Sequence, residues 1–558
     1  MMNLKESTIA YFSMEIGMDP AVPTYSGGLG ILAGDTLRSC ADLKLPVIGV
    51  TLLYKKGYFK QEIDEEGNQT EQEVKWEPSS VLEELPKQVS INIEGREIKI
   101  KAWLYELMGA TGNINPIIFL DTDVADNNEE DRRITHHLYG HDERYRLMQE
   151  IILGIGGARM LEKLGCHELK KYHMNEGHSA LLTVELCHRF SDTKNPIEEA
   201  RDRCVFTTHT PVPAGHDQFP QELAEKLLGE MITPALRNEI FIDGKLNMTY
   251  LGLRFSRFIN GVAKKHGEVS RNMFPGYHIE SITNGVHSYF WIAPPFREVF
   301  DKYLPGWEYD PFSLRYVLGI PKEDMWSAHQ KAKKSLIEYI NKNYNSGMDK
   351  DTFTIGFARR AATYKRGDML FSDVNRLMKI AAKSKGIQII YAGKAHPKDQ
   401  AGKDIIKRII CKMKEVKDKI KVCYVKNYDI DSAKLLVSGV DIWLNTPLRP
   451  QEASGTSGMK AAHNGVPHFS TLDGWWLEGH IENVTGWSIG AHPDESKENI
   501  HENDVEDMYT KLEYIILPKF YDERDKWIEV MRHAIAINGS FFNTHRMVQQ
   551  YVLNAYFK

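Results

Sequence analysis

Short apolar runs rich in β-branched residues alternate along the chain with longer stretches in which apolar residues recur every three to four positions. The first pattern is typical of buried strands and the second of amphipathic helices, so their alternation predicts βαβ units, parallel sheets and an α/β fold class. The strands are expected at residues 46–53, 116–120, 204–208, 279–283, 352–358, 387–392, 421–425 and 440–444. Long helical patterns cover residues 144–164 and 322–344.

The chain has 558 residues, which is long enough for two or more domains with large cores. A loop-rich stretch between residues 285 and 320 separates the two sets of strands and predicts two domains, residues 1–290 and residues 291–558. The acidic stretch at residues 62–73 and the basic stretch at residues 403–421 are expected to be solvated surfaces.

The composition is that of an ordinary globular protein, with 42% hydrophobic and 26% charged residues. The 70 Lys and Arg residues nearly balance the 76 Asp and Glu residues, so the net charge of -6 gives no reason to expect binding to nucleic acid or to a membrane surface. The six cysteines are scattered without a CxxC pair, which favours a reducing compartment. The sequence shows no signal peptide and no membrane-spanning run, so we expect a cytoplasmic protein.

Two histidines, His137 and His141, have the i, i+4 spacing of metal ligands on a helix. The HExxH order is absent, however, and no distant third ligand suggests itself. We therefore expect no metal site in this chain.

The candidate chemistry gathers after the strands of the second half, and in a doubly wound sheet ligands bind outside the carboxyl ends of the strands. Four cations follow the strand at 352–358, namely Arg359, Arg360, Lys365 and Arg366. Guanidinium groups bind phosphate through paired hydrogen bonds and a lysine adds a point charge, so this segment is suited to hold two phosphates. A solvated basic turn is the alternative interpretation.

A loop rich in small residues, Glu452–Lys460, follows the strand at 440–444. Its glycines let the backbone approach a ligand, and the start of the following helix would offer free N–H groups to an anion. Lys460 is expected just inside that helix, where neighbouring cations would lower the pKa of its amine and favour a Schiff base with an aldehyde. A solvated lysine is the commoner alternative.

Three segments of the expected first domain also carry groups suited to a polar ligand. The sequence SGGLG at residues 26–30 precedes a helical pattern and makes a second backbone cradle for an anion. His209 and Asn284 each follow the end of an expected strand, where they could hydrogen-bond a ligand. The alternative is that both are structural residues with satisfied hydrogen bonds.

In their order along the chain, these motifs resemble those of the α-glucan phosphorylases, which act on glycogen, starch or maltodextrin. The similarity runs from YFSMEIGM at residues 11–18 to about residue 480, through SGGLG, THTPVPAGHD, SITNGVH, ARRAATYKR and EASGTSGMK with HNGVPHFSTLDGWW after it. The resemblance implies the GT-B architecture, two Rossmann-like doubly wound domains that face a central cleft, with the last helix packing back on the first domain. It also implies pyridoxal 5'-phosphate, bound in the C-terminal domain.

The resemblance further implies roles for single residues. Lys460 would form the Schiff base with pyridoxal 5'-phosphate, and the catalytic set would be Lys460, Arg360, Lys365 and His209. The other cofactor-binding residues would be Gly455, Thr456, Tyr428, Gly28 and Arg359. Substrate would be bound by Gly27, Gly28, Leu29, His209, Asn284, Glu452, Arg360 and Lys365, with Glu452 facing the hydroxyls of the glucosyl unit.

The implied reaction is reversible phosphorolysis, in which a terminal α-1,4-glucosyl unit passes to inorganic phosphate and leaves as α-D-glucose 1-phosphate with retained configuration. Phosphate held by Arg360 and Lys365 would protonate the departing oxygen and then trap an oxocarbenium-like sugar on the same face. The implied partners are an α-1,4-glucan, inorganic phosphate and glucose 1-phosphate, with neither nucleic acid nor membrane. A homo-oligomer is left open.

The chain also departs from the large animal and plant members of the family. It is much shorter and runs from SMEIGM almost directly into SGGLG, so we expect no control by phosphorylation of an N-terminal segment. Three other functions stay open. A nucleotide-sugar glucosyltransferase would not need Lys460, a carbanion-type pyridoxal enzyme would need an acidic partner for the pyridine nitrogen, and a glucan-binding scaffold would release no glucose 1-phosphate.

Overall fold

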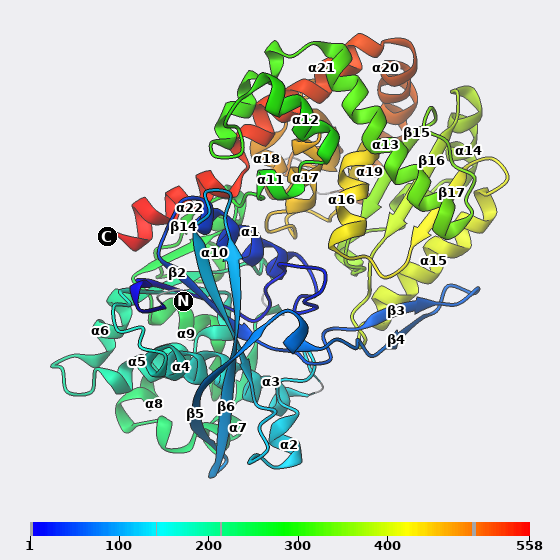
Figure 1. Cartoon of the computed structure of the whole chain (residues 1–558). Helices are drawn as coiled ribbons and strands as arrows, with labels where there is room; N and C mark the ends of the chain where they lie inside the picture. The colour runs from blue at the N-terminus through cyan, green and yellow to red at the C-terminus, as the bar shows by residue number, and fades with distance from the viewer. Residues whose placement is uncertain (1–3, 141, 213–214, 494–497, 558) are drawn as a thin grey trace. The chain divides into compact units, whose positions relative to one another are not determined.

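The computed structural model describes residues 4–140, 142–212, 215–493 and 498–557. The chain divides into two compact units, and each is described by itself (Figure 1). Unit 1 consists of Met1–Phe59, Glu73–Thr283 and Met547–Lys558, and unit 2 of Lys60–Gln72 and Asn284–Arg546. Among the described residues, no helix combines the length and the apolar character needed to cross a membrane.

Unit 1 is built on a nine-stranded sheet in the order β14-β13-β9-β8-β1-β2-β7-β6-β5. The seven strands from β14 to β7 are parallel, and β6 and β5 are added in antiparallel orientation. The central strands are buried along their whole length, which explains why they are continuous apolar runs in the sequence. The strands are β1 Ile9–Ser13, β2 Val47–Leu52, β5 Glu83–Ile93, β6 Arg96–Met108, β7 Ile114–Asp121, β8 Lys171–Asn175, β9 Cys204–Thr207, β13 Phe258–Gly261 and β14 Glu280–Ser281.

The expected helix at 144–164 is one continuous helical stretch with a π-helical turn, Ile152–Gly156, in its middle. The side chain of Asp142 caps it by accepting a hydrogen bond from the N–H of Tyr145 at 2.8 Å. The helices of unit 1 are α1 Gly28–Asp42, α2 Glu129–Arg132, α3 Glu143–Ile151, α4 Gly157–Lys163, α5 Leu182–Arg189, α6 Pro196–Arg203, α7 Gln221–Leu228, α8 Pro234–Ile240, α9 Met248–Arg254 and α10 Lys264–Met273. A small antiparallel sheet adds β10 Gln218–Pro220, β12 Lys245–Asn247 and β11 Phe241–Ile242.

Unit 2 contains a six-stranded, fully parallel sheet in the order β17-β16-β15-β18-β19-β20. Numbered along the chain, this is the order 3-2-1-4-5-6 of a doubly wound sheet, whose winding reverses between the first and fourth strands. The switch point therefore lies between β15 and β18, which pair with Ile355 opposite Ile442. The strands are β15 Phe353–Ala358, β16 Ile387–Ala392, β17 Lys421–Val425, β18 Ile442–Asn445, β19 His468–Thr471 and β20 Gly486–Ile489.

The long helix expected at 322–344 is α13, Lys322–Tyr344. It begins directly after Pro321 and ends at Tyr344, where the following Asn345 adopts the left-handed conformation that stops helices (φ 49°). The other helices of unit 2 are α11 Ser288–Trp291, α12 Pro294–Tyr303, α14 Val374–Lys383, α15 Gln400–Val416, α16 Ile430–Gly439, α17 Thr456–His463, α18 Trp476–Gly479, α19 Ile500–Lys511, α20 Leu517–Asp522 and α21 Arg524–His533. Helix α22, Thr544–Tyr551, runs across the division between the units.

The acidic stretch at 62–73 is not simply a solvated surface. It forms a hairpin of β3, Lys60–Ile63, and β4, Gln69–Gln72, that belongs to unit 2 (Figure 1). The side-chain amide of Gln61 donates to the carbonyl of Gly393 at 2.8 Å, and that of Gln69 donates to the carbonyl of Ala395 at 2.9 Å. The uncharged glutamines are thus buried, while the carboxylates between them face solvent.

The last residues of the chain, from Met547 on, belong to unit 1. Tyr551 and Tyr556 are buried in its core, where their hydroxyls meet polar groups of the sheet. The hydroxyl of Tyr556 lies 2.7 Å from Nδ1 of His173 in β8, and the hydroxyl of Tyr551 accepts a hydrogen bond from Asn260 in β13 at 3.0 Å. The C-terminal segment is therefore an integral part of the core of unit 1.

Candidate functional site

Two cations and a carboxylate meet at the switch point of the unit 2 sheet. Arg359 follows the end of β15, and Glu452 lies in the loop between β18 and α17. One oxygen of Glu452, Oε2, lies 2.6 Å from Nη1 of Arg359 and 2.6 Å from Nζ of Lys365. All three side chains are about nine-tenths buried, so water screens these charges little.

The two cations keep Glu452 ionised. Burial by itself would raise the pKa of this carboxyl group, but the charges of Arg359 and Lys365 outweigh burial and lower the pKa to about 2. For the neighbouring Tyr364, burial would raise the pKa of the phenol, but the charges of Lys365, Arg360 and Arg359 together outweigh burial and lower the pKa. Glu452 is therefore a carboxylate at neutral pH.

Arg359 is held from a second side by Asn445, the last residue of β18. The guanidinium donates to Oδ1 of Asn445, and the amide nitrogen of Asn445 donates to Oγ of Ser470 in β19 at 3.0 Å. A chain of hydrogen bonds thus runs across the ends of two neighbouring strands to the cation. Nothing in the sequence around Asn445 alone pointed to this role.

Arg366 is turned away from the other three cations of its segment. Its guanidinium donates to the carbonyl of Thr446 at 2.9 Å and to Asp504 at 2.7 Å. Arg449 binds the other oxygen of Asp504 at 2.6 Å, so the fully buried carboxylate is shared by two arginines. Arg366 therefore ties the segment to the end of β18 and to α19 rather than offering its charge to a ligand.

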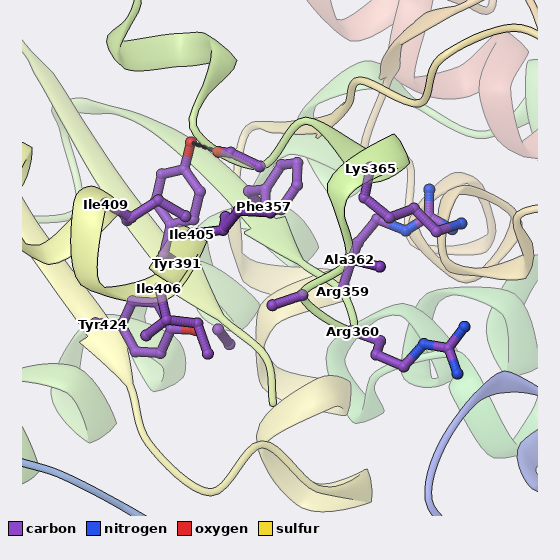
Figure 2. Close-up of a pocket in the computed structure, with 13 residues that line it drawn as sticks. Phe357, Arg359, Arg360, Ala362, Lys365, Tyr391, Ile405, Ile406, Ile409 and Tyr424 are labelled. Atoms are coloured by element: carbon purple, nitrogen blue, oxygen red, sulfur yellow. Dashed lines mark hydrogen bonds between the residues drawn. The ribbon is translucent and has the colours of Figure 1, made fainter. Parts of the chain in front are cut away.

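A pocket lies behind this segment. Figure 2 shows its two halves, with the charged ends of Arg360 and Lys365 on one side and the rings of Tyr391 and Tyr424 on the other. The hydroxyl of Tyr391 donates to the carbonyl of Gly367 at 2.9 Å, which leaves an apolar wall facing inward. The lining residues are Phe357, Arg359, Arg360, Ala361, Ala362, Lys365, Gly367, Tyr391, Ala392, Ile405, Ile406, Ile409 and Tyr424.

Lys460 lies in the middle of α17, which begins at Thr456 directly after Gly455. Gly455 has φ of 87°, a conformation that L side chains rarely adopt, so the glycine is required for this entry into the helix. The Nζ of Lys460 lies 3.9 Å from the ring centroid of Trp291, and the lysine is only 8% exposed. The lysine is thus a desolvated amine against an aromatic face, unlike a solvated surface lysine.

Two further residues expected at the site also belong to unit 2. Tyr428 lies half-buried in the loop between β17 and α16. Asn284 is buried, and its side-chain oxygen has no hydrogen-bond partner among the described residues. A buried amide oxygen without a partner is the kind of group that a ligand hydroxyl would satisfy.

In unit 1, His209 follows the end of β9 and is fixed by two residues that sequence reasoning missed. Its Nε2 lies 2.6 Å from Oδ1 of Asn175, and its backbone N–H donates to Oε2 of Glu176 at 2.7 Å. Burial lowers the pKa of His209 to about 3, so the imidazole is neutral at physiological pH. The backbone of Glu176 has φ of 78°, and such a strained backbone conformation next to a candidate residue is typical of a functional site.

The SGGLG segment is anchored by Glu15, two residues after the end of β1. The carboxylate accepts hydrogen bonds from the N–H of Ser26 and, at 3.1 Å, from that of Gly27, and also from the hydroxyl of Tyr139 at 2.8 Å. A Cβ at Gly27 or Gly28 would meet no atom within 4 Å, so the backbone there is open to close approach by a ligand. Leu29 belongs to α1, which begins at Gly28.

The structure therefore brings Arg359, Lys365 and Glu452 into direct contact, with Arg360 lining the same pocket. Three residues considered in the sequence, His141 together with Pro213 and Ala214 of THTPVPAGHD, lie outside the described residues.

Comparison with known proteins gives a consistent result. A family model described as carbohydrate phosphorylase matches residues 14–102 and 233–515. The chain is 39% identical to the maltodextrin phosphorylase of Thermococcus litoralis, over 99% of this chain and 71% of that protein. It is 34% identical to the glycogen phosphorylase of Mycobacterium tuberculosis, over 98% and 70%, and 35% identical to that of Aquifex aeolicus, over 99% and 86%. The chain belongs to the carbohydrate phosphorylase family.

Proposed function

We propose that the protein is an α-glucan phosphorylase, which transfers terminal α-1,4-glucosyl units of glycogen, starch or maltodextrin to inorganic phosphate and yields α-D-glucose 1-phosphate with retention. Membership of the family and the printed names of the relatives support this reaction. The observation that carries it in this chain is the pairing of Arg359 and Lys365 with Glu452 at the switch point, on the loop that leads to Lys460.

In this proposal Arg360 and Lys365 bind the substrate phosphate. Two cations match the charge of a phosphate dianion, and the burial of Lys365 makes its contact stronger than it would be in water, whereas Arg360 is exposed. When phosphate binds to these cations, Glu452 remains ionised and can accept hydrogen bonds from sugar hydroxyls. The phosphate would donate a proton to the departing glycosidic oxygen and stabilise the positive charge that develops on the sugar.

The neutral His209 and the unpartnered oxygen of Asn284 are suited to hydrogen bonds with hydroxyls of the glucosyl unit. Gly27, Gly28 and Leu29 would add backbone contacts to the phosphate, because no side chain hinders approach to the two glycines.

The residues around Lys460 fit pyridoxal 5'-phosphate. A desolvated amine against Trp291 suits a flat aromatic ring, and Gly455 and Thr456 at the start of α17 leave backbone N–H groups for a phosphate. Lys460 would hold the cofactor, with Tyr428, Gly28 and Arg359 as further contacts. When bound, the cofactor would supply its phosphate group as a proton donor and acceptor beside the substrate phosphate.

The same proposal includes the GT-B architecture with domains at about residues 1–290 and 291–558. Support comes from the parallel sheet of each unit and from the doubly wound strand order in unit 2.

The direct test is phosphate-dependent release of glucose 1-phosphate from maltodextrin by the purified, cofactor-loaded protein. Lys365→Met should lower kcat/KM by about a thousandfold, because a buried charge opposite the phosphate is lost. Lys385→Met is the matched control, since Lys385 is an exposed lysine paired with Asp522, and it should leave kcat/KM unchanged. Glucosyl transfer from a nucleotide sugar without any phosphorolysis would favour the synthase alternative and contradict the proposal.

A further inference from the structure

The segment that carries Glu452 is tied to a second segment, Asp473–Trp475, which follows β19. The carboxyl group of Asp473 accepts the N–H of Glu452 on Oδ2 at 2.8 Å and the N–H of Gly474 on Oδ1 at 2.9 Å. The N–H of Trp475 donates to the carbonyl of Ser454 at 2.9 Å. The two segments are therefore joined at Glu452 and again two residues later.

The fit between these segments leaves no room for change. Gly474 has φ of 54°, and a Cβ at this position would lie 2.5 Å from the carbonyl oxygen of Ser454. The tight contact and the left-handed backbone together require glycine, so Asp473 and Trp475 are held in fixed positions on either side of it. Asp473 is 3% exposed, so water could reach the two N–H groups that it accepts only if the loop opened.

Glu452 is thus restrained at both ends. Its carboxylate is drawn to Arg359 and Lys365, while its backbone is fixed by Asp473. With the carboxylate attraction alone, the loop could shift and still satisfy the cations, because a glutamate side chain has three rotatable bonds. The backbone anchor removes this freedom and sets where the second carboxylate oxygen points.

We propose that Asp473 is a positioning residue, which acts through Glu452 to orient the carboxylate that faces the sugar hydroxyls. This inference rests on the proposed phosphorolysis. It assigns Asp473 no contact with substrate or cofactor. Its whole effect on the reaction passes through the geometry of Glu452.

A double-mutant cycle tests this dependence. We expect Asp473→Ala to lower kcat/KM for phosphorolysis by about tenfold or more in the wild-type background, but by less than about twofold in the Glu452→Gln background, because the group it positions has already been changed. Asp473→Asn keeps one acceptor oxygen and should recover most of the activity in the wild-type background. Asp473→Asn also provides a variant to measure if Asp473→Ala does not fold.

Asp373→Ala provides the control. Asp373 also caps a backbone N–H, that of Arg376 at 2.8 Å, but it lies at the start of α14. Its substitution should change kcat/KM by less than about twofold in both backgrounds.

The inference would be overturned if Asp473→Ala lowered kcat/KM equally in the two backgrounds. It would also be overturned if Asp473→Asn and Asp473→Ala lowered kcat/KM equally in the wild-type background. Either result would leave the proposed function intact. Absence of phosphorolysis in the wild-type, cofactor-loaded protein is a different result, which would overturn both.

Discussion

Asp441→Asn should destabilise unit 2 more than an ordinary surface change, because Asp441 is the centre of a buried charge cluster. Its Oδ1 lies 2.8 Å from Nε2 of His329, and its Oδ2 lies 2.5 Å from Nζ of Lys333 and accepts the N–H of Thr354 at 2.7 Å. Asp441 and Lys333 are fully buried and His329 is 1% exposed. The cluster fixes the starts of β15 and β18, the strands that lead to the site.

The size of the effect follows from what the substitution leaves behind. Asparagine would keep a hydrogen-bond acceptor but remove the negative charge, so the ammonium group of Lys333 would stay buried with the carbonyl of Thr352 and no counter-charge. Removal of one partner from a buried ion pair costs about 3–5 kcal/mol of unfolding free energy. Lys333→Met combined with Asp441→Asn should recover part of this loss, because no unpaired charge remains.

Urea unfolding followed by tryptophan fluorescence suits this test, since eight of the ten tryptophans lie in unit 2. Asp351→Asn is the control, because Asp351 pairs with Lys350 at 2.8 Å but is 79% exposed. Its loss should cost less than about 1 kcal/mol. A loss from Asp441→Asn as small as that of the control would refute the reasoning.

Three further results are expected. Asn445→Ala should weaken binding of pyridoxal 5'-phosphate by about tenfold, because Arg359, a proposed contact of the cofactor, loses the acceptor that orients it; an unchanged dissociation constant of the cofactor would contradict this. Glu452 has a folded-state pKa of about 2 against an ordinary 4.5, so its contribution of about 3 kcal/mol is present above pH 4.5 and is lost as pH falls toward 2. The urea midpoint should therefore fall less steeply with decreasing pH in Glu452→Gln than in the wild type. Parallel curves of midpoint against pH would contradict the ion pair between Glu452 and Lys365. Tyr556→Phe should destabilise unit 1 by about 1 kcal/mol, measured by hydrogen exchange of its sheet, because a buried imidazole nitrogen loses its partner.

Eight of the thirteen parallel strands described were predicted, mostly from short apolar runs, whereas β1, β8, β13, β19 and β20 were missed. The strand expected at 352–358 is β15, Phe353–Ala358, and that at 387–392 is β16. The hairpin of β5 and β6 was missed because its residues alternate between polar and apolar, as in a half-exposed antiparallel pair. Its two-residue turn, Glu94–Gly95, has positive φ at both positions and was the available signal.

The site divides in a similar way. The cations and Glu452 occur in local motifs, so sequence reasoning could find them and expect them at one sheet edge. Asp473 and Asn445 act through contacts between segments that are distant in sequence, and their residue types carry no local signal. Glu15 lies within the YFSMEIGM motif, yet only the folded chain shows that its carboxylate holds the SGGLG loop.

The central claim, a phosphorylase that holds pyridoxal 5'-phosphate on Lys460, is tested most directly by borohydride reduction of the cofactor-loaded protein followed by peptide mapping. The account predicts a phosphopyridoxyl group on the peptide that contains Lys460, and its absence in Lys460→Ala. An unmodified Lys460 after incubation with excess cofactor would contradict the account.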